Sequence, residues 1–150
     1  MKRYSRTFEL RWSDADANGH IRHTVYAELG AEVRIAFLRD AGFDWKAFSA
    51  AGIGPVLLRE QLDYLHEIGM GERVTIDLAA VGLSPDGGRW ILRHDVYKQD
   101  GALAARVVVT GGWIDLAARR LTTPPEALAR HMAELARAED FRELPSLKRS

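Results

Sequence analysis

Residues 14–26 read DADANGHIRHTVY, and this stretch joins a strand-like run to a long apolar helical pattern. Before it, Phe8, Leu10 and Trp12 alternate with polar residues, which is the period of a half-buried strand. After it, apolar residues recur at helical spacing over most of the helix circumference, and a helix of this kind is buried. The sequence therefore predicts a strand, a loop rich in acidic and basic side chains, and a buried helix.

The loop places carboxylates and imidazoles beside the predicted N-terminus of the helix. Backbone N–H groups at such a terminus have no intrahelical partner, so they can bind an oxyanion. Chemistry on a carbonyl group is therefore the first functional hypothesis. The motif Gly-x-Ser-x-Gly is absent from the chain, which argues against a serine hydrolase.

Part of the loop also matches a calcium-binding motif. Asp14, Asp16, Asn18 and Gly19 stand where an EF-hand loop has its first ligands and its turn glycine. That loop also needs a bidentate Glu at its twelfth position and a helix on each side. The twelfth position here is Val25, and the preceding residues have strand periodicity. Both features argue against a calcium site.

The composition is typical of a soluble globular chain. The 150 residues are 47% hydrophobic and 28% charged, with no net formal charge and no Cys, so we expect one domain over residues 1–150 with a charged tail from about residue 139. Without Cys there is no disulfide, no thiol nucleophile and no Cys-based metal site. No basic run interleaved with aromatic residues indicates a nucleic-acid partner.

Membrane and export signals are not expected in this sequence. No apolar run approaches the ~20 residues that span a membrane. The N-terminal residues alternate between apolar and polar types instead of forming the apolar core of a signal peptide. We therefore expect a cytoplasmic protein without a membrane partner.

The remaining chain predicts four further strands and a second helix. Short turns between consecutive strands indicate an antiparallel meander. The β-rich or alternating runs are residues 56–64, 74–80, 90–96 and 103–114. Trp45 and Phe48 predict only a short turn after the first helix. The sequence Thr123-Pro124-Pro125-Glu126 predicts a capping box that opens the C-terminal helix.

This order of elements predicts an α+β fold. A five-stranded antiparallel sheet wraps around one long central helix, which covers one face of the sheet, and an extra helix lies near the C-terminus. Such a sheet has open edges, and pairing two copies edge to edge would cover one of them. A net charge near zero does little to discourage this self-association.

The element order and the loop together resemble the hotdog-fold acyl-CoA thioesterases of the 4-hydroxybenzoyl-CoA thioesterase type. The resemblance covers roughly residues 4–128. The opening pattern of that family is matched by Asp14, Asp16, Gly19, His20, Ile21 and Tyr26. Further matches are Glu60 and Tyr64 in one strand, Gly71-Glu72, the turn at Gly87-Gly88, and the strand end at Ile114-Asp115. Arg22 and His66 depart from the pattern, since many relatives carry Asn and Pro there.

The resemblance implies hydrolysis of an acyl-CoA or acyl-carrier-protein thioester, in a homodimer or homotetramer whose active site lies at the subunit interface. It implies that Asp16 is the catalytic carboxylate, as nucleophile or as general base, and that the backbone N–H of His23 binds the thioester carbonyl. The candidate substrate-binding residues are Asn18, His20, Tyr26 and Glu60. No metal and no redox cofactor is expected.

Three other interpretations stay open at this stage. Asp-rich loops commonly just cap turns, so Asp16 and Asp14 can be structural residues. The chain can be a hotdog-fold hydratase or dehydratase, although the His of that family stands five residues after its Asp and His20 stands only four after Asp16. It can also be a non-catalytic acyl-CoA-binding subunit on the same fold.

Overall fold

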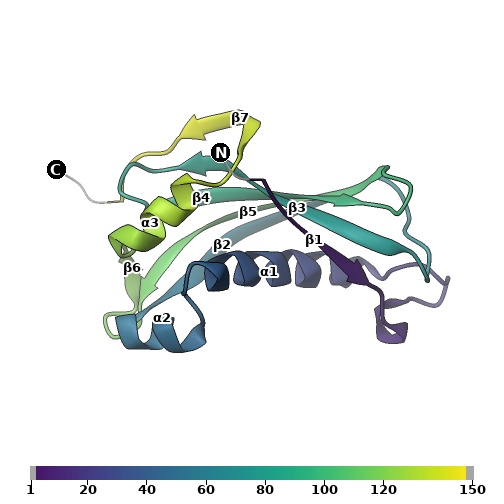
Figure 1. Ribbon diagram of the computed structural model, residues 1–150, viewed down its shortest axis with the longest axis horizontal. Coiled ribbons are helices and arrows are strands. Elements are labelled where there is room, and N and C mark those ends of the chain that lie inside the picture. The colour runs from purple at the N-terminus through teal and green to yellow at the C-terminus, as the bar shows by residue number, and fades with distance from the viewer. Residues whose placement is uncertain (1–2, 148–150) are drawn as a thin grey trace.

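The centre of the fold is the helix α1 (His23–Asp40), along which a curved sheet wraps (Figure 1). The computed structural model describes residues 3–147. The predicted loop lies at one end of α1, and the short helix α2 (Trp45–Ala51) lies at the other end. Within residues 3–147, no helix is long and apolar enough to cross a membrane.

Within residues 3–147 the sheet has seven strands, not the five that the sequence predicts. Its main path runs β1-β3-β4-β5-β2 with every neighbouring pair antiparallel, as expected for a meander. The strands of this path are β1 (Tyr4–Glu9), β2 (Ile53–Tyr64), β3 (Arg73–Leu83), β4 (Arg89–Tyr97) and β5 (Leu103–Asp115). The two additional strands are β6 (Arg120–Thr122), which pairs with β5, and β7 (Arg137–Glu143), which pairs with β3 in parallel.

The sequence does not predict the two additional strands, because neither shows the apolar alternation of a half-buried strand. β6 is only three residues long, which is too short to display an alternation. β7 reads RAEDFRE and its pattern of burial is mostly exposed, so its composition resembles that of a solvated tail. The prediction of a charged tail from about residue 139 is therefore wrong for residues 139–143.

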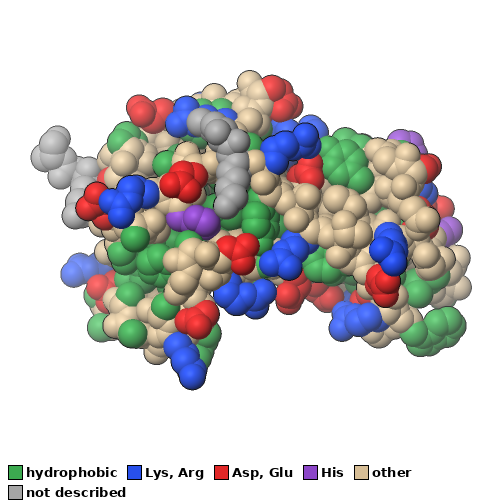
Figure 2. All heavy atoms as spheres, viewed as in Figure 1, with side chains coloured by type: hydrophobic (Ala, Val, Ile, Leu, Met, Phe, Trp, Pro, Cys, Tyr) green, Lys and Arg blue, Asp and Glu red, His purple; other side chains and the backbone are tan. Residues whose placement is uncertain are grey.

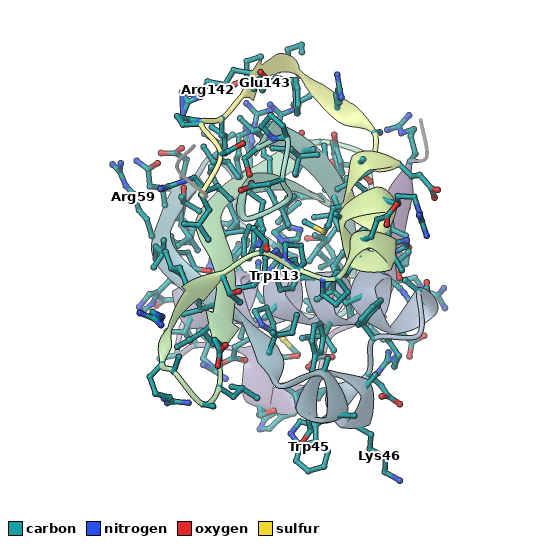
Figure 3. The ribbon with its side chains drawn as sticks, turned by 90° about the vertical axis from the view of Figure 1, so that its left-hand side faces the viewer. Trp45, Lys46, Arg59, Trp113, Arg142 and Glu143 are labelled. Carbon is teal, nitrogen blue, oxygen red and sulfur yellow. The ribbon has the colours of Figure 1, made fainter. Side chains whose placement is uncertain are left out.

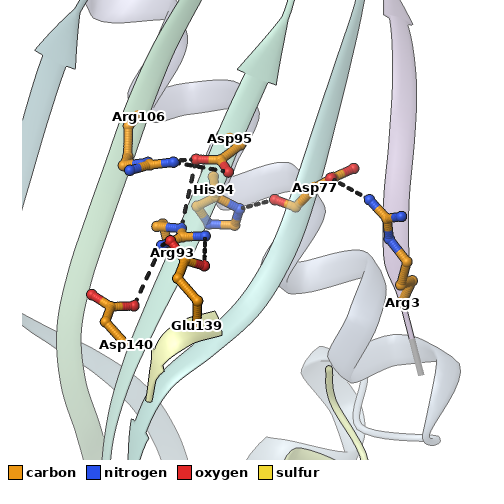
Figure 4. A network of polar contacts seen from close by, with 8 residues as sticks. All are labelled: Arg3, Asp77, Arg93, His94, Asp95, Arg106, Glu139 and Asp140. Carbon is orange, nitrogen blue, oxygen red and sulfur yellow. Dashed lines mark hydrogen bonds and ion pairs between the residues drawn. The ribbon is translucent and has the colours of Figure 1, made fainter. Parts of the chain in front are cut away.

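Charged side chains also join β7 to β4 (Figure 4). Arg93 of β4, whose side chain is only 10% exposed, lies 3.0 Å from the Glu139 carboxylate of β7. Arg106 of β5 donates to the Asp95 carboxylate of β4 at 2.7 Å. These contacts allow a strand with few apolar residues to stay paired, because its carboxylates compensate a guanidinium that the sheet largely buries.

Two details of the helices differ from the prediction. The segment after α1 is a helix of seven residues instead of a short turn, and the Asp44 side chain caps it by accepting from the N–H of Ala47 at 2.8 Å. The predicted capping box at Thr123 is wrong. The helix α3 (Glu126–Ala133) begins after Pro125, which stands at its N-cap with extended backbone and no side-chain cap.

The core fills the space between α1 and the sheet. Val25 and Val33 of α1 are fully buried, as the apolar circumference of the helix predicts, and Trp113 of β5 is 1% exposed in the same interior. Figure 3 shows Trp113 within the fold, whereas Trp45 and Lys46 of α2 project away from it. On the face shown in Figure 2, basic and acidic side chains are interspersed.

Candidate active site

The loop between β1 and α1 is fixed by the buried side chain of Asp14. The Asp14 carboxylate accepts from the backbone N–H of Arg11 at 2.7 Å and from its guanidinium at 2.9 Å. These hydrogen bonds to Arg11 lower the pKa of Asp14. The carbonyl of Asp14 also accepts from the N–H of Arg22 at 2.8 Å, which links the start of the loop to the start of α1. Asp14 therefore holds the loop.

The loop also docks against the connection between β2 and β3. Isolated β-bridges pair Ala15 with Ile21 and His20 with Gly69. The N–H of Ile21 donates to the carbonyl of Ile68 at 2.8 Å, and both of these apolar side chains are buried. The loop is consequently anchored on two sides, by α1 and by the β2–β3 connection.

Asp16 is exposed at the tip of this anchored loop, and one of its carboxylate oxygens is held by the backbone. Its Oδ1 accepts from the N–H of Asn18 at 2.8 Å and from the N–H of His20 at 3.2 Å. Gly19 completes the turn with a φ of +78°, a conformation that a residue with a Cβ rarely adopts. Within residues 3–147 the second oxygen, Oδ2, has no hydrogen-bond partner. The carboxylate is therefore oriented and one oxygen remains available.

The first turn of α1 presents an available backbone donor. The N–H of His23 donates to no group among residues 3–147, because the first N–H groups of a helix have no intrahelical acceptor. The carbonyl of His23 accepts from the Tyr64 hydroxyl at 3.2 Å, which ties the first turn to the end of β2. Arg22 turns its guanidinium toward the carbonyl of Ser13, at 3.0 Å from Nε.

A polar hollow of about 280 Å³ lies over these groups. All predicted site residues except Glu60 line it, whereas Glu60 lies on the exposed part of the strand β2 outside the hollow. The second wall comes from the end of β2 and the residues after it, and the sequence predicted none of these residues for the site, although Tyr64 matches the family pattern and His66 departs from it. The full lining is Asp16, Asn18, His20, Ile21, His23, Tyr26, Tyr64, Leu65, His66 and Glu67.

Tyr26 forms the buried wall of the hollow. It is 5% exposed, and burial is the main reason that its pKa rises to about 12, so the phenol is neutral at physiological pH. Its ring meets the Tyr64 ring edge to face, with centroids 5.3 Å apart. Opposite the tyrosines, the His20 imidazole Nε2 lies 3.2 Å from a carboxylate oxygen of Glu67.

The hollow combines the parts needed for addition to a carbonyl. It holds an oriented carboxylate with one available oxygen, an available N–H at the positive end of a helix, and a neutral aromatic wall. Residues 3–147 contain no cluster of three or more His, Asp or Glu side chains placed to bind a metal ion.

Comparison with known proteins gives one match over most of the chain: residues 10–132 match the thioesterase-like superfamily. No curated protein sequence matches the chain. Among solved structures, a hypothetical protein from Staphylococcus aureus in complex with CoA has a TM-score of 0.82 at 22% identity, over 99% of this chain and 90% of that chain.

Two further similar structures are thioesterases. A 1,4-dihydroxy-2-naphthoyl-CoA thioesterase from Synechocystis has a TM-score of 0.79 at 15% identity, over 89% of this chain and 98% of that chain. A DHNA-CoA thioesterase from Staphylococcus aureus has a TM-score of 0.74 at 20% identity, over 82% of this chain and 81% of that chain. These similarities confirm the predicted hotdog fold.

Proposed function

The chain belongs to the thioesterase-like superfamily, and from this we propose that it hydrolyses an acyl-CoA or acyl-carrier-protein thioester to the free acid and the thiol. The observation that carries the proposal is the pairing, in one hollow, of the available Asp16 oxygen with the available N–H of His23. The fold similarity to a protein in complex with CoA and to two aryl-CoA thioesterases supports a CoA thioester as the substrate.

The proposed reaction is of the 4-hydroxybenzoyl-CoA thioesterase type. The Asp16 oxygen either attacks the carbonyl carbon or takes a proton from the water that attacks it. The new C–O bond places negative charge on the carbonyl oxygen, which the N–H of His23 binds. The C–S bond then breaks and the thiolate leaves. If water attacked, the acid forms directly and the proton held by Asp16 passes to the thiolate or to solvent. If Asp16 attacked, the product is an acyl-Asp16 anhydride, the thiolate takes a proton from solvent, and a water molecule hydrolyses the anhydride to the free acid and the Asp16 carboxylate. A single oxyanion donor of this kind is typically worth about 3 kcal/mol in the transition state.

The other residues of the hollow have positioning roles in this proposal. Asn18 and His20 orient the carboxylate through their backbone N–H groups, and Tyr26 supplies an apolar wall for the acyl group. Tyr64 fixes the first helical turn through its hydrogen bond to the carbonyl of His23, so it keeps the N–H direction constant.

We also propose that the active form is a homodimer joined along β2. This strand ends the main path of the sheet, so one of its backbone edges is unpaired in the sheet, and it carries Leu57 and Leu58 at 43% and 58% exposure. A long exposed edge strand with apolar side chains favours pairing with another strand. A second copy of β2 would cover both the backbone edge and these side chains.

The test of the activity is release of free thiol from a panel of short, long and aromatic acyl-CoA thioesters. The proposal expects catalytic release from at least one of them. Hydration of an enoyl-CoA without thiol release would instead identify a hydratase. Saturable binding of acyl-CoA without turnover of any substrate would identify a binding subunit, and either result would refute the proposal.

A further inference from the structure

A second cavity, of about 120 Å³, lies between the C-terminal half of α1 and the sheet. A cavity of about 150 Å³ can take up a molecule of benzene, so this volume suits the end of an acyl group. Most of its wall is apolar and comes from Phe37, Leu38, Val56, Leu92, Trp113 and Met132. Two of the lining residues, Arg34 and Trp90, have side chains that carry hydrogen-bond donors.

The guanidinium of Arg34 experiences the charge of Glu60 but forms no ion pair with it. Its one hydrogen bond within residues 3–147 joins Nη1 to Nε2 of His94 at 2.8 Å, and it forms no ion pair there. Burial lowers the pKa of Arg34 and the charge of Glu60 raises it, and an arginine side chain in a protein stays charged. A largely buried cation with no carboxylate in direct contact is unfavourable unless another group compensates it.

His94 does not supply the missing charge. It is fully buried, and burial with the nearby Arg34 lowers its pKa to about 3, so the imidazole is neutral. Its Nδ1 donates to the carbonyl of Asp77 at 3.1 Å, which leaves Nε2 to accept from Arg34. Gly30 makes room for this ring, since a Cβ there would lie 3.1 Å from the His94 Cδ2. The imidazole orients Arg34 without neutralising it.

Trp90 contributes a second donor without an acceptor. The residue is 3% exposed, and its indole Nε1 is inaccessible to solvent without a hydrogen-bond partner in residues 3–147. Buried donors are nearly always paired in folded proteins, so an orphaned one beside a cavity needs an explanation. An acceptor oxygen on a molecule bound in the cavity would provide the missing partner.

The geometry points to an acyl group that carries a carboxylate at its far end, with Arg34 binding the carboxylate and Trp90 donating to one of its oxygens. This inference rests on the proposed function and names its substrate class: CoA thioesters of dicarboxylic acids. A guanidinium is well suited to a carboxylate because it offers several donors in one plane.

The proposed homodimer gives the acyl group a short route to Arg34. Within one copy, Arg34 stands eleven residues after His23, which is about 16 Å along the helix. Antiparallel pairing of two β2 strands about their middle places the end of β2 in one copy beside its start in the other. The hollow contacts the end of β2 at Tyr64, and the cavity contacts its start at Pro55 and Val56.

The test compares kcat/KM for two thioesters of equal chain length, one with a terminal carboxylate and one with a terminal methyl group. The wild type should prefer the carboxylate by about tenfold or more. Arg34→Met should reduce this preference by about tenfold to a hundredfold, the effect of losing a hydrogen bond to a charged group. Arg34→Lys should retain part of it, and Trp90→Phe, which removes only the N–H, should reduce it by a smaller factor.

Arg39→Met is the matched control, because Arg39 lies on the same helix and is exposed. Its preference should equal that of the wild type. Equal rates for the two thioesters in the wild type, or an unchanged preference in Arg34→Met, would overturn the inference and leave the proposed function standing. If Arg34→Met does not fold, the test rests on Arg34→Lys and Trp90→Phe, measured by the same ratio of kcat/KM for the carboxylate thioester to kcat/KM for the methyl thioester.

A binding measurement separates the inference from the proposed function. Calorimetry with two non-hydrolysable CoA thioethers, one with a terminal carboxylate and one with a terminal methyl group, measures recognition without catalysis. If no thioester is hydrolysed, the proposed function fails. The carboxylate thioether should still bind more tightly, and that difference should shrink in Arg34→Met; equal affinities in the wild type would refute the inference as well.

Discussion

Acidification should destabilise the protein through His94. This histidine is fully buried, and its pKa falls from 6.5 to about 3 on folding, mainly because burial disfavours the imidazolium. The unfolded chain therefore binds a proton between these two pKa values while the folded protein does not. Stability is then fully present above pH 6.5 and is lost as the pH falls below it.

The magnitude follows from the two pKa values. At pH 5, about 1.5 units below the unfolded-state pKa of 6.5, protonation of the imidazole stabilises the unfolded state by about 2 kcal/mol. The folded state gains almost nothing, because its pKa is about 3. The measurement is the free energy of unfolding in urea at pH 8 and at pH 5. His94→Asn removes a buried ring and its hydrogen bonds, so it should lower the free energy of unfolding at pH 8. It also removes the titrating group, so it should reduce the difference in that free energy between the two pH values by about 2 kcal/mol.

The control for this prediction is an exposed histidine. His66 is exposed at the hollow and its Nδ1 donates one hydrogen bond to the carbonyl of Leu103, so His66→Asn should keep the pH dependence of the wild type. If His94→Asn shows the same loss of stability between pH 8 and pH 5 as the wild type, the assignment of the acid sensitivity to His94 is refuted.

Two further substitutions test the packing. Gly111→Ala would place a Cβ 2.3 Å from the Trp90 ring and should cost about 1–3 kcal/mol in the free energy of unfolding. The control Gly54→Ala, whose Cβ would have its nearest contact at 3.8 Å, should cost less than half of that. Equal effects would contradict the close packing of Gly111 against Trp90. Arg93→Met removes the guanidinium that binds Glu139 of β7, and it should cost about 2 kcal/mol in urea unfolding. Arg3→Met, at 86% side-chain exposure, should stay within about 0.5 kcal/mol. An equally small effect of Arg93→Met would remove its role in holding β7.

The sequence predicts the fold well where the pattern is local. The apolar circumference of α1 predicts its burial, and the alternation of Trp90, Leu92, His94 and Val96 predicts which face of β4 is internal. His94 lies in this core, and its Nδ1 donates to the carbonyl of Asp77. β7 is different, because its pairing depends on Arg93 of a distant strand and not on its own composition.

The residues of the candidate site also fall into two groups, those that a local pattern predicts and those that only tertiary packing brings together. Asp16, Asn18, His20 and His23 are close in sequence, so a loop before a helix brings them together. The wall that begins at Tyr64 lies more than forty residues later, and it reaches the hollow only because the loop docks on the β2–β3 connection. Arg34 and His94 likewise meet only through the packing of α1 on β4. No local pattern reports such contacts.

The central claim is that the charge of Asp16 acts on a thioester. The most direct test is thiol release by Asp16→Asn, because an amide oxygen can still accept from the N–H groups of Asn18 and His20 and keep the loop in place. Asp115→Asn is the matched control, since Asp115 caps a turn in the same way outside the hollow. We predict a loss of about a hundredfold or more in Asp16→Asn and a wild-type rate in Asp115→Asn. A wild-type rate in Asp16→Asn would contradict the account.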